Sequence, residues 1–385
     1  WSGAGIHAMY VKGFKATGNT IWDCRYSGIG AEAIVDFEIS SNRIWDIHDT
    51  AVYNSGNNAY GIVVSPKTAA ISKHGKITNN IIEDVRSWEG IDLHGGDDII
   101  IDSNTLIDCN CGIAATDDSI NTLGSQRVVI SNNTIYTNHG AGEIIPSGRS
   151  GILFNGASAT YKAYGGSITG NTIQGQVPGI ATFNTIGTVI SANTIKESGV
   201  GMDLQDGSEN ILVTGNTIIH SAGAGIRIFP IAGDTTYGLV TGNTINSGTH
   251  PAVYINQSSG GTVTKLNFRN NYLISDVFPY TADAGGLVMF EGDIIPLKNI
   301  VYQWNPAEIL AGANLAVDVT ATGMEAAAGI VATAVMTYSM SGLNLEATPG
   351  TDKVTLTLYN NTTGAVNLTD RIYQIMVNKM ALVPY

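Results

Sequence analysis

The stretch from Gly90 to Asp98, GIDLHGGDD, brings three carboxylates and a histidine within nine residues. Such side chains can bind a metal, exchange protons with a substrate or form a charged turn. A zinc site is not expected, because no second histidine follows at ligand spacing. We predict that Asp92 and His94 project from a strand, as acid/base groups or as a solvated sheet face. Gly95 to Asp98 are then expected to form the turn.

Two acidic clusters are candidates for catalysis. The first joins Asp92 and His94 to Glu89 and to the next acidic pair in the chain, Asp117 and Asp118. Neighbouring carboxylates about 5 to 9 Å apart are the arrangement that glycosidases use, one as acid and one as base or nucleophile. The first cluster could therefore cleave a glycosidic bond.

The second cluster joins Asp203, Gln205 and Asp206 to Arg227 and Phe229. It combines two carboxylates with an amide, a cation and an aromatic ring. Elimination from a uronate sugar stays open, since it requires a base for the C5 proton and a cation beside the sugar carboxylate. Arg227, His94 and Tyr254 could serve as this base and cation.

A repeat organises the chain that carries these clusters. Asparagine followed by a small or polar residue and then Ile or Leu recurs ten times, most often every 22 to 24 residues with longer insertions between: Asn19, Asn42, Asn80, Asn104, Asn133, Asn171, Asn193, Asn216, Asn243 and Asn271. About eight residues later, most repeats carry a second motif of four consecutive residues: small, aliphatic, variable and apolar. It begins at Gly90, Gly112, Gly179, Gly201, Gly225 and Ala252. A fixed period with insertions is typical of a solenoid.

Three short β-branched strands in each repeat predict a right-handed parallel β-helix of about ten coils. The recurring asparagine would sit at one corner of every coil, where its amide stacks on the next in a hydrogen-bonded ladder. Leucine-rich repeats and glycine-rich calcium repeats are not expected, because their motifs are absent.

The coil geometry predicts which side chains face outward. In Gly-Ile-x-Leu the aliphatic side chains enter the lumen and x points out. Stacking the coils then gives an outward row of Asp92, Ala114, Leu153, Ala181, Asp203, Arg227 and Tyr254. A second row, two residues further along each strand, contains His94, Thr116, Asn155, Phe183, Gln205, Phe229 and Asn256. Aromatic and amide side chains on such a surface suit a sugar chain.

The repeat ends near Pro296, where the composition changes. The segments NLAVDVTATG and DKVTLTLYNN alternate with period two and carry no ladder asparagine. We therefore expect a parallel β-helix over residues 1–295 that binds and cleaves substrate. An antiparallel β-sandwich over 296–385 would cap it, hold subunits together or bind carbohydrate.

Composition narrows the partners of this chain. Lys and Arg number 19 against 32 Asp and Glu, a formal net charge of −13, so nucleic acid is an improbable partner. No apolar run reaches the roughly 18 residues of a membrane span, so membrane insertion is not expected. The three cysteines, an odd number, are expected to be free thiols. No cofactor or metal is expected.

The Asn-Thr-Ile coils over about residues 15–275 and the ending VTLTLYNNTTGAVNL resemble the tailspike depolymerases of bacteriophages, within the pectate-lyase-like β-helix group. The resemblance implies a homotrimer on the virion tail that binds and cleaves host capsular polysaccharide or lipopolysaccharide. It also implies a missing N-terminal region that attaches to the baseplate, which agrees with the absent initiator methionine.

Three functions are open: a polysaccharide-cleaving tailspike, with hydrolysis slightly favoured over elimination; a non-catalytic spike or adhesin; and a secreted, monomeric lyase or epimerase. For cleavage we favour Asp203 and Asp206 as catalytic carboxylates, then Asp92 and Asp117. The residues expected to bind sugar are His94, Gln205, Arg227, Phe229, Tyr254 and Glu143, the last from an insertion that could overhang the groove with Arg149.

Overall fold

The structure is a computed structural model of the 385-residue chain. It describes residues 3–48, 58–68, 70–85, 87–117, 124–137, 150–158, 160–230, 235–255, 263–275, 280–282, 287–291, 296–304, 310–320, 330–336, 343–350, 353–364 and 371–379. Across these ranges the regular structure is entirely β-strand, without an α-helix. Accordingly, none of the described segments is a helix that could span a bilayer.

Three long parallel sheets form the larger part of the molecule. Sheet A has eleven strands in the order β1 (Ala4–Met9), β4 (Ser27–Glu32), β7 (Tyr60–Ser65), β10 (Glu89–His94), β13 (Cys111–Thr116), β16 (Ile152–Asn155), β20 (Ile180–Phe183), β24 (Met202–Gln205), β27 (Ile226–Phe229), β30 (Val253–Ile255) and β33 (Tyr280–Ala282). Sheet C has ten, in the order β3 (Thr20–Cys24), β6 (Arg43–Ile47), β9 (Ile81–Glu83), β12 (Thr105–Ile107), β15 (Thr134–Tyr136), β19 (Thr172–Gln174), β23 (Thr194–Lys196), β26 (Thr217–Ile219), β29 (Thr244–Asn246) and β32 (Tyr272–Ile274).

Sheet B lies between them in the order of the chain and is 13-stranded. Its main path is β2 (Lys15–Thr17), β5 (Val35–Ser40), β8 (Lys73–Thr78), β11 (Asp97–Asp102), β14 (Val129–Ser131), β18 (Ser167–Thr169), β22 (Val189–Ser191), β25 (Glu209–Thr214), β28 (Thr235–Thr241), β31 (Val263–Arg269) and β34 (Leu287–Glu291). Two short strands, β17 (Ala163–Tyr164) and β21 (Thr185–Ile186), pair beside this path.

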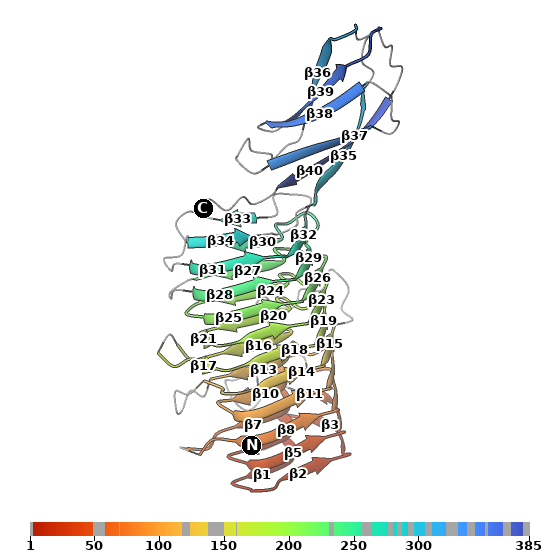
Figure 1. Ribbon diagram of the computed structural model, residues 1–385. Coiled ribbons are helices and arrows are strands. Elements are labelled where there is room, and N and C mark those ends of the chain that lie inside the picture. Colours follow the sequence, from red (N-terminus) through yellow and green to blue (C-terminus); the bar gives the residue numbers. More distant parts are fainter. Residues whose placement is uncertain are drawn as a thin grey trace.

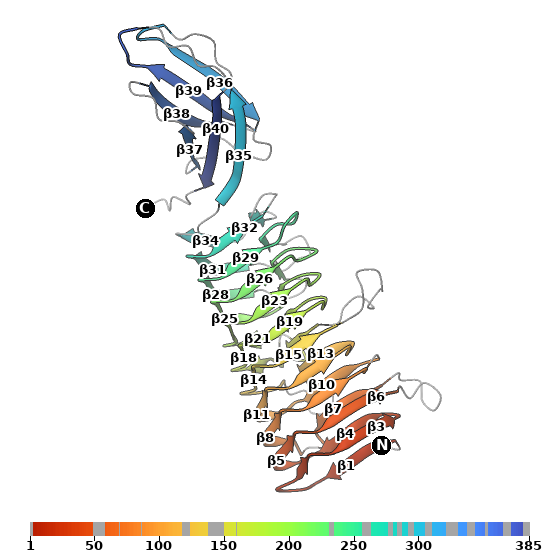
Figure 2. The ribbon, with the colours of Figure 1, turned by 90° about the vertical axis from the view of Figure 1, so that its right-hand side faces the viewer.

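Each turn of the chain contributes one strand to each sheet, and every strand pairs in parallel with its counterpart in the next turn. Figures 1 and 2 show the coils stacked into a long rod, with β1 to β3 at one end and β33 and β34 at the other. The predicted parallel β-helix of about ten coils is therefore confirmed.

Aliphatic side chains fill the lumen of the rod. From β4 to β30, the residues of sheet A that alternate with the outward rows are buried in the lumen, such as Ile91 and Leu93 in β10. Sheet C contributes one buried residue per coil, the Ile or Leu of the Asn-x-Ile/Leu repeat, such as Ile135 and Ile173. The period-two pattern thus places one hydrophobic core along the axis of the rod.

The asparagine ladder lies at the corner between sheets B and C. The Asn171 side-chain amide donates to Asn193 Oδ1 at 2.9 Å and to the Ile130 carbonyl at 2.9 Å, and Asn171 Oδ1 accepts from the Asn133 backbone and side-chain N–H groups at 2.9 and 3.0 Å. The preceding residue turns the corner with a positive φ, as at Gly170 (68°), a conformation that glycine adopts without strain. The ladder predicted from the repeat is confirmed.

Beyond the last coil the chain forms two three-stranded antiparallel sheets (Figure 1). One has the order β35 (Pro296–Trp304), β40 (Arg371–Lys379) and β37 (Ile330–Met336). The other has the order β36 (Asn314–Thr320), β39 (Lys353–Asn360) and β38 (Leu343–Gly350), and β38 contacts β37 of the first sheet. Antiparallel strands after Pro296 were expected and are confirmed.

One local prediction is corrected. Asp97 and Asp98 were expected in the turn after β10, but they are the first residues of β11, and only Gly95 and Gly96 separate the two strands. Asp97 forms an ion pair with Arg127 of the next coil. The coil turns more tightly than the sequence indicated because Gly95 adopts a positive φ of 57°. The cysteines are free, as predicted, and Cys109 and Cys111 are buried.

Candidate functional site

The predicted outward rows exist on sheet A. Successive backbone pairings place Asp92, Ala114, Leu153, Ala181, Asp203, Arg227 and Tyr254 on one line across the coils. The second row pairs His94 with Thr116 and aligns Asn155, Phe183, Gln205 and Phe229. The last residue predicted for it, Asn256, lies outside the described residues. Sheet A thus presents a continuous polar and aromatic face.

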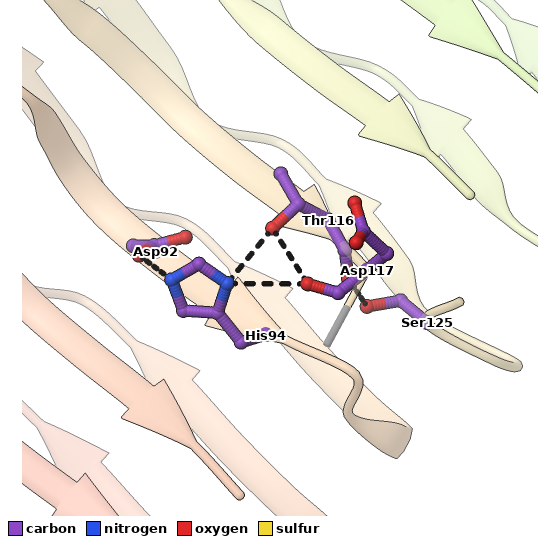
Figure 3. Close-up of polar contacts among 5 residues, drawn as sticks. All are labelled: Asp92, His94, Thr116, Asp117 and Ser125. Atoms are coloured by element: carbon purple, nitrogen blue, oxygen red, sulfur yellow. Dashed lines mark hydrogen bonds and ion pairs between the residues drawn. The ribbon is translucent and has the colours of Figure 1, made fainter. Parts of the chain in front are cut away.

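Asp92 and His94 form an ion pair on β10 (Figure 3). His94 Nε2 lies 2.6 Å from Asp92 Oδ2, and Nδ1 lies 3.2 Å from the Asp117 carbonyl oxygen and 3.1 Å from Thr116 Oγ1. The Asp92 side chain is 2% exposed, whereas that of His94 is 37% exposed. His94 is therefore the member of this pair that a ligand on the face of sheet A can reach.

The geometry favours a cationic His94. One ring nitrogen faces a carboxylate and the other faces a backbone carbonyl and the Thr116 hydroxyl, so a protonated ring can donate from both nitrogens. The Asp92 carboxylate is the main reason that the pKa of His94 rises to about 9, against the opposing effect of burial. The ring's hydrogen bonds to Asp92 and to the Asp117 carbonyl, and the charge of Glu89, act in the same direction.

Two tyrosines extend this cluster toward the first coils. Burial, followed by the charges of Asp92 and Glu32, raises the pKa of Tyr26 to about 12. Burial and then the charges of Asp92 and Glu89 raise the pKa of Tyr60 as well. The two rings meet edge to face with centroids 5.5 Å apart, and Trp88 lies 6.3 Å from Tyr60.

Sequence reasoning missed these tyrosines, although a signal was present. Tyr26 lies two residues before the Gly28-Ile29 pair of its coil, and Tyr60 directly before Gly61-Ile62, so both belong to the same motif that identified Gly90-Ile91. Tyrosine is protonated at neutral pH even at its ordinary pKa near 10, and the raised pKa values keep both hydroxyls protonated in more alkaline solution as well. They therefore offer hydroxyl groups beside the buried carboxylates of Glu89 and Asp92.

Asp117 follows β13, on the coil next to His94. Its backbone carbonyl faces the imidazole, while its half-buried carboxylate points away from the ring (Figure 3). Ser125 Oγ donates to the Thr116 carbonyl at 2.9 Å beside it. The structure therefore brings Asp92, His94 and Asp117 together; Asp118 lies outside the described residues.

The second cluster is a different arrangement. Arg227 Nε donates to Asp203 Oδ1 at 2.9 Å, and Arg227 Nη2 and Gln205 Nε2 both donate to Asp203 Oδ2. Asp203 is 1% exposed, and hydrogen bonding to its carboxylate raises the pKa of Arg227. Both carboxylate oxygens are thus occupied by groups on adjacent coils, as in a bidentate structural pair.

The remaining predicted residues surround this pair. The Arg227 guanidinium lies over the Phe229 ring, with its Cζ 5.3 Å from the ring centroid. Tyr254 follows Arg227 in the first outward row. Asp206 is half-buried in the turn after β24, and its backbone carbonyl accepts a hydrogen bond from Asn184. Glu143 and Arg149 lie outside the described residues.

The two clusters have distinct chemical capacities. Four coils at about 4.8 Å each separate Asp92 from Asp203 by roughly 19 Å, so they cannot act on one bond. The first contains an imidazolium that is partly exposed on the face of sheet A, Asp117 with its carboxylate directed away from that ring, and two tyrosines whose pKa values are raised. Such strongly perturbed titratable groups are typical of catalytic sites. The second presents a neutralised cation over an aromatic ring, a surface that suits binding.

Comparison with known proteins identifies the family. The model of the right handed beta helix region matches residues 1–123, 45–146 and 118–299, which together cover most of the chain. The chain belongs to this family, and the handedness predicted from the repeat is confirmed. Among curated proteins there is no significant match.

Solved structures with the same fold include enzymes and a tailspike. A mutant of the periplasmic alginate epimerase AlgG shares 16% identity with a TM-score of 0.54, over 71% of this chain and 62% of that chain. An endo-xylogalacturonan hydrolase from Aspergillus tubingensis shares 17% identity with a TM-score of 0.52, over 76% of this chain and 84% of that one. The tailspike protein gp49 from Pseudomonas phage LKA1 shares 12% identity with a TM-score of 0.42, over 97% of this chain and 67% of that one.

The epimerase and the hydrolase share the fold with this chain. A right-handed β-helix similar to those of the pectate-lyase-like group, expected from the coil motif, is thus confirmed.

Proposed function

We propose that this protein binds a bacterial surface polysaccharide along the outward face of sheet A and hydrolyses its glycosidic bonds, as the tailspike of a phage. The observation that carries the proposal is the His94 imidazolium, held between a buried carboxylate and a backbone carbonyl at the start of the second outward row. The names of the similar structures, an alginate epimerase, a xylogalacturonan hydrolase and a tailspike, support a polysaccharide as the ligand.

The first cluster is the better candidate for cleavage. His94 is protonated at neutral pH and partly exposed on the face of sheet A, so it can act as the proton donor to the leaving oxygen. Asp117 supplies the nearby carboxylate that could accept a proton from the attacking water. Asp92 is a positioning residue, because it lies beneath the ring and keeps the imidazole charged.

The second cluster serves as a binding subsite in this proposal. Asp203 is enclosed by Arg227 and Gln205 and has no surface to offer a sugar. It fixes Arg227 over Phe229, and the exposed third of Arg227, with Tyr254, would contact the polysaccharide. The sequence favoured Asp203 and Asp206 as catalytic groups. In this proposal their cluster binds the polysaccharide instead.

The test measures how cleavage of bacterial capsules depends on pH for the His94→Gln, Asp92→Asn and Asp117→Asn variants. The formation of new reducing ends reports the cleavage. Loss of a general acid or base should lower kcat by about 10²- to 10⁴-fold. In Asp92→Asn the alkaline limb of kcat/KM should move from about pH 9 toward the ordinary histidine value of 6.5. A merely structural role for Asp92 would leave that limb in place.

Other outcomes would select other functions. Tight capsule binding by the wild type without reducing ends would indicate a non-catalytic adhesin. A rising ultraviolet absorbance of the products would indicate elimination. If Asp203→Asn and Asp206→Asn abolish kcat while the three variants of the first cluster retain it, cleavage takes place at the second cluster.

The tailspike assignment includes three further expectations. The protein would be a homotrimer on the virion tail, acting outside the host cell. A region that precedes the first coil would join it to the baseplate. Finally, residues 1–295 would form the substrate-binding domain and residues 296–385 a terminal domain that caps it or joins the subunits.

A further inference from the structure

Sheet A carries every buried carboxylate in the part of the chain that the structure describes. These are four side chains: Glu32 on β4, Glu89 and Asp92 on β10, and Asp203 on β24. A carboxylate loses its hydration when it is buried, so a protein buries one only where a cation or hydrogen bonds compensate for the loss. Their concentration on one sheet therefore indicates that these buried charges serve the face of that sheet.

Three of these carboxylates hold a cation that reaches the surface. Two are Asp92 and Asp203, in the ion pairs described above. The third is Glu32, whose Oε2 lies 3.0 Å from Lys67 Nζ; the Glu32 side chain is 4% exposed, against 38% for Lys67. In each pair the carboxylate is buried and the cation is partly exposed, so the three pairs present positive charge to a ligand.

Lys67 lies near the imidazole of the candidate site. Backbone pairing places Glu32 on the line of the second outward row, two coils before its first residue, His94. Lys67 follows the strand between them, β7, in a turn closed by two backbone hydrogen bonds with Ala70 at 2.9 and 3.0 Å. Lys67 and His94 thus stand on adjacent coils, which are about 4.8 Å apart along the axis.

We propose that the ligand of sheet A is an acidic polysaccharide, and that Lys67 and His94 together bind an oxyanion substituent of its sugars, either a carboxylate or a phosphate. This rests on the proposed function, whose substrate it narrows and to whose site it adds Lys67. The exposed cation of each pair lies closer to a bound sugar than the carboxylate beneath it, so the pair attracts an anion although its net charge is zero. The buried partner also fixes the cation before binding, which lowers the entropy lost when the ligand binds.

The charge of the rest of the molecule agrees with such a ligand only on this face. A chain with a formal net charge of −13 repels an acidic polymer, so contact requires a surface that presents cations. No carboxylate on the described strands of sheet A is exposed. The half-buried Asp117 and Asp206 follow the strands, and the Asp117 carboxylate is directed away from the His94 ring (Figure 3). A polymer along the axis would contact Lys67, His94 and, five coils beyond His94, Arg227.

The first experiment measures the affinity of the wild-type protein for capsules purified from a panel of bacterial strains. The capsule bound most tightly is then treated in two ways, by reduction of its carboxyl groups to alcohols and by removal of its phosphates with hydrofluoric acid. We expect this capsule to be acidic, and one of the two treatments to weaken its binding at least about tenfold. Added salt should weaken the binding as well. A neutral capsule as the tightest ligand, or full binding after both treatments, would refute the proposal.

The second experiment tests Lys67 itself. Lys67→Gln should bind the acidic capsule about tenfold more weakly, with a raised KM and an unchanged kcat, whereas Lys67→Arg should bind it like the wild type. The matched control is Lys15→Gln, since Lys15 also pairs with a glutamate of an adjacent coil, Glu38, but on sheet B. If Lys67→Gln fails to fold because Glu32 has lost its cation, the double variant Glu32→Gln/Lys67→Gln takes its place. Affinities equal to that of Lys15→Gln would show that Lys67 does not contact the polymer.

The same measurements separate this inference from the proposed function. An acidic capsule that is bound but not cleaved contradicts hydrolysis and leaves the inference intact. Cleavage of a neutral capsule contradicts the inference and leaves hydrolysis intact. A protein that binds no capsule contradicts both.

Discussion

At the scale of single residues, the candidate site depends on how charges are paired across coils. His94 owes its charge to Asp92, two residues away on the same strand, and to a carbonyl of the next coil. Arg227 is held by Asp203 of the preceding coil. Each cation reaches the surface and each carboxylate stays beneath it, so the face of sheet A presents positive groups on a chain that is acidic overall.

The first prediction concerns the titration of His94. By NMR, its ring should titrate near pH 9 in the wild type, and near the ordinary value of 6.5 in Asp92→Asn. Because the folded-state pKa is raised, the protonated ring stabilises the fold fully below pH 6.5, and this contribution is lost as the pH rises through about 9. The unfolding free energy of the wild type should therefore fall relative to His94→Gln over that range. An unshifted ring would contradict the ion pair.

The second prediction concerns Asp203. Asp203→Asn should lower the free energy of unfolding by on the order of 2 kcal/mol, because it leaves Arg227 half-buried beside an uncharged amide. Water reaches the exposed third of Arg227, which keeps the cost below that of a fully buried pair. Asp98→Asn, at an exposed carboxylate of β11, is the control and should change stability little. Urea denaturation of both variants measures the difference; equal midpoints would show that the ion pair contributes nothing.

At the scale of the elements, the asparagine ladder determines the register of every coil. Each internal ladder residue both donates to the next and accepts from the previous one, so its loss leaves several buried groups unpaired. The residue at the first rung, Asn19, donates to Asn42 and is itself half-exposed. Positions along the ladder should therefore differ in sensitivity.

The third prediction compares these positions. Asn171→Ala should destabilise the protein by about 3 to 5 kcal/mol, since the Asn133 N–H groups lose Asn171 Oδ1 as their acceptor, and Asn193 Oδ1 and the Ile130 carbonyl each lose a donor in a buried corner. Asn19→Ala should cost about 1 kcal/mol. Thermal unfolding followed by circular dichroism gives both values. Equal losses would mean that the ladder is not the source of the stability at this corner.

The sequence predicted the elements better than the site. The Asn-x-Ile period is local and gives coils, the alternation of each strand gives inward and outward faces, and stacking gives the rows, so Asp203 and Arg227 were correctly placed as neighbours. What could not be derived is burial. Whether an outward carboxylate such as Asp92 meets water depends on the tyrosines of other coils and on the histidine of its own strand, whose side-chain conformations no periodic pattern specifies.

At the scale of the whole molecule, the terminal sheets bear on the stability of the rod. The last described coils bury Phe268 and Leu273 in the lumen, and β35 of the terminal sheets contacts β32 of that end. A solenoid must cover its final core residues, and the two antiparallel sheets beyond the last coil are positioned to contribute to this (Figure 2).

The fourth prediction follows from this arrangement. A chain that ends at residue 295 should keep the circular dichroism of parallel β-structure, melt about 5 °C or more below the full chain and bind more of a hydrophobic dye. The matched control is a fusion of residues 1–295 to an unrelated soluble domain, because only the chain's own terminal sheets are expected to cover this end of the core. A truncated chain with unchanged melting temperature and dye binding would show that the terminal sheets do not cover the core.

The uniform coil repeat determines how the outward face of sheet A can change during evolution. His94 and Arg227 stand on β10 and β27, strands of one continuous sheet whose coils are joined by the same ladder bond at every step. Duplication or loss of a whole coil re-forms that bond and changes the distance between the two clusters by about 4.8 Å, without shifting a side chain to the other face. The separation of the two clusters can therefore evolve in discrete increments, so related β-helices can present the same two groups of side chains at different spacings.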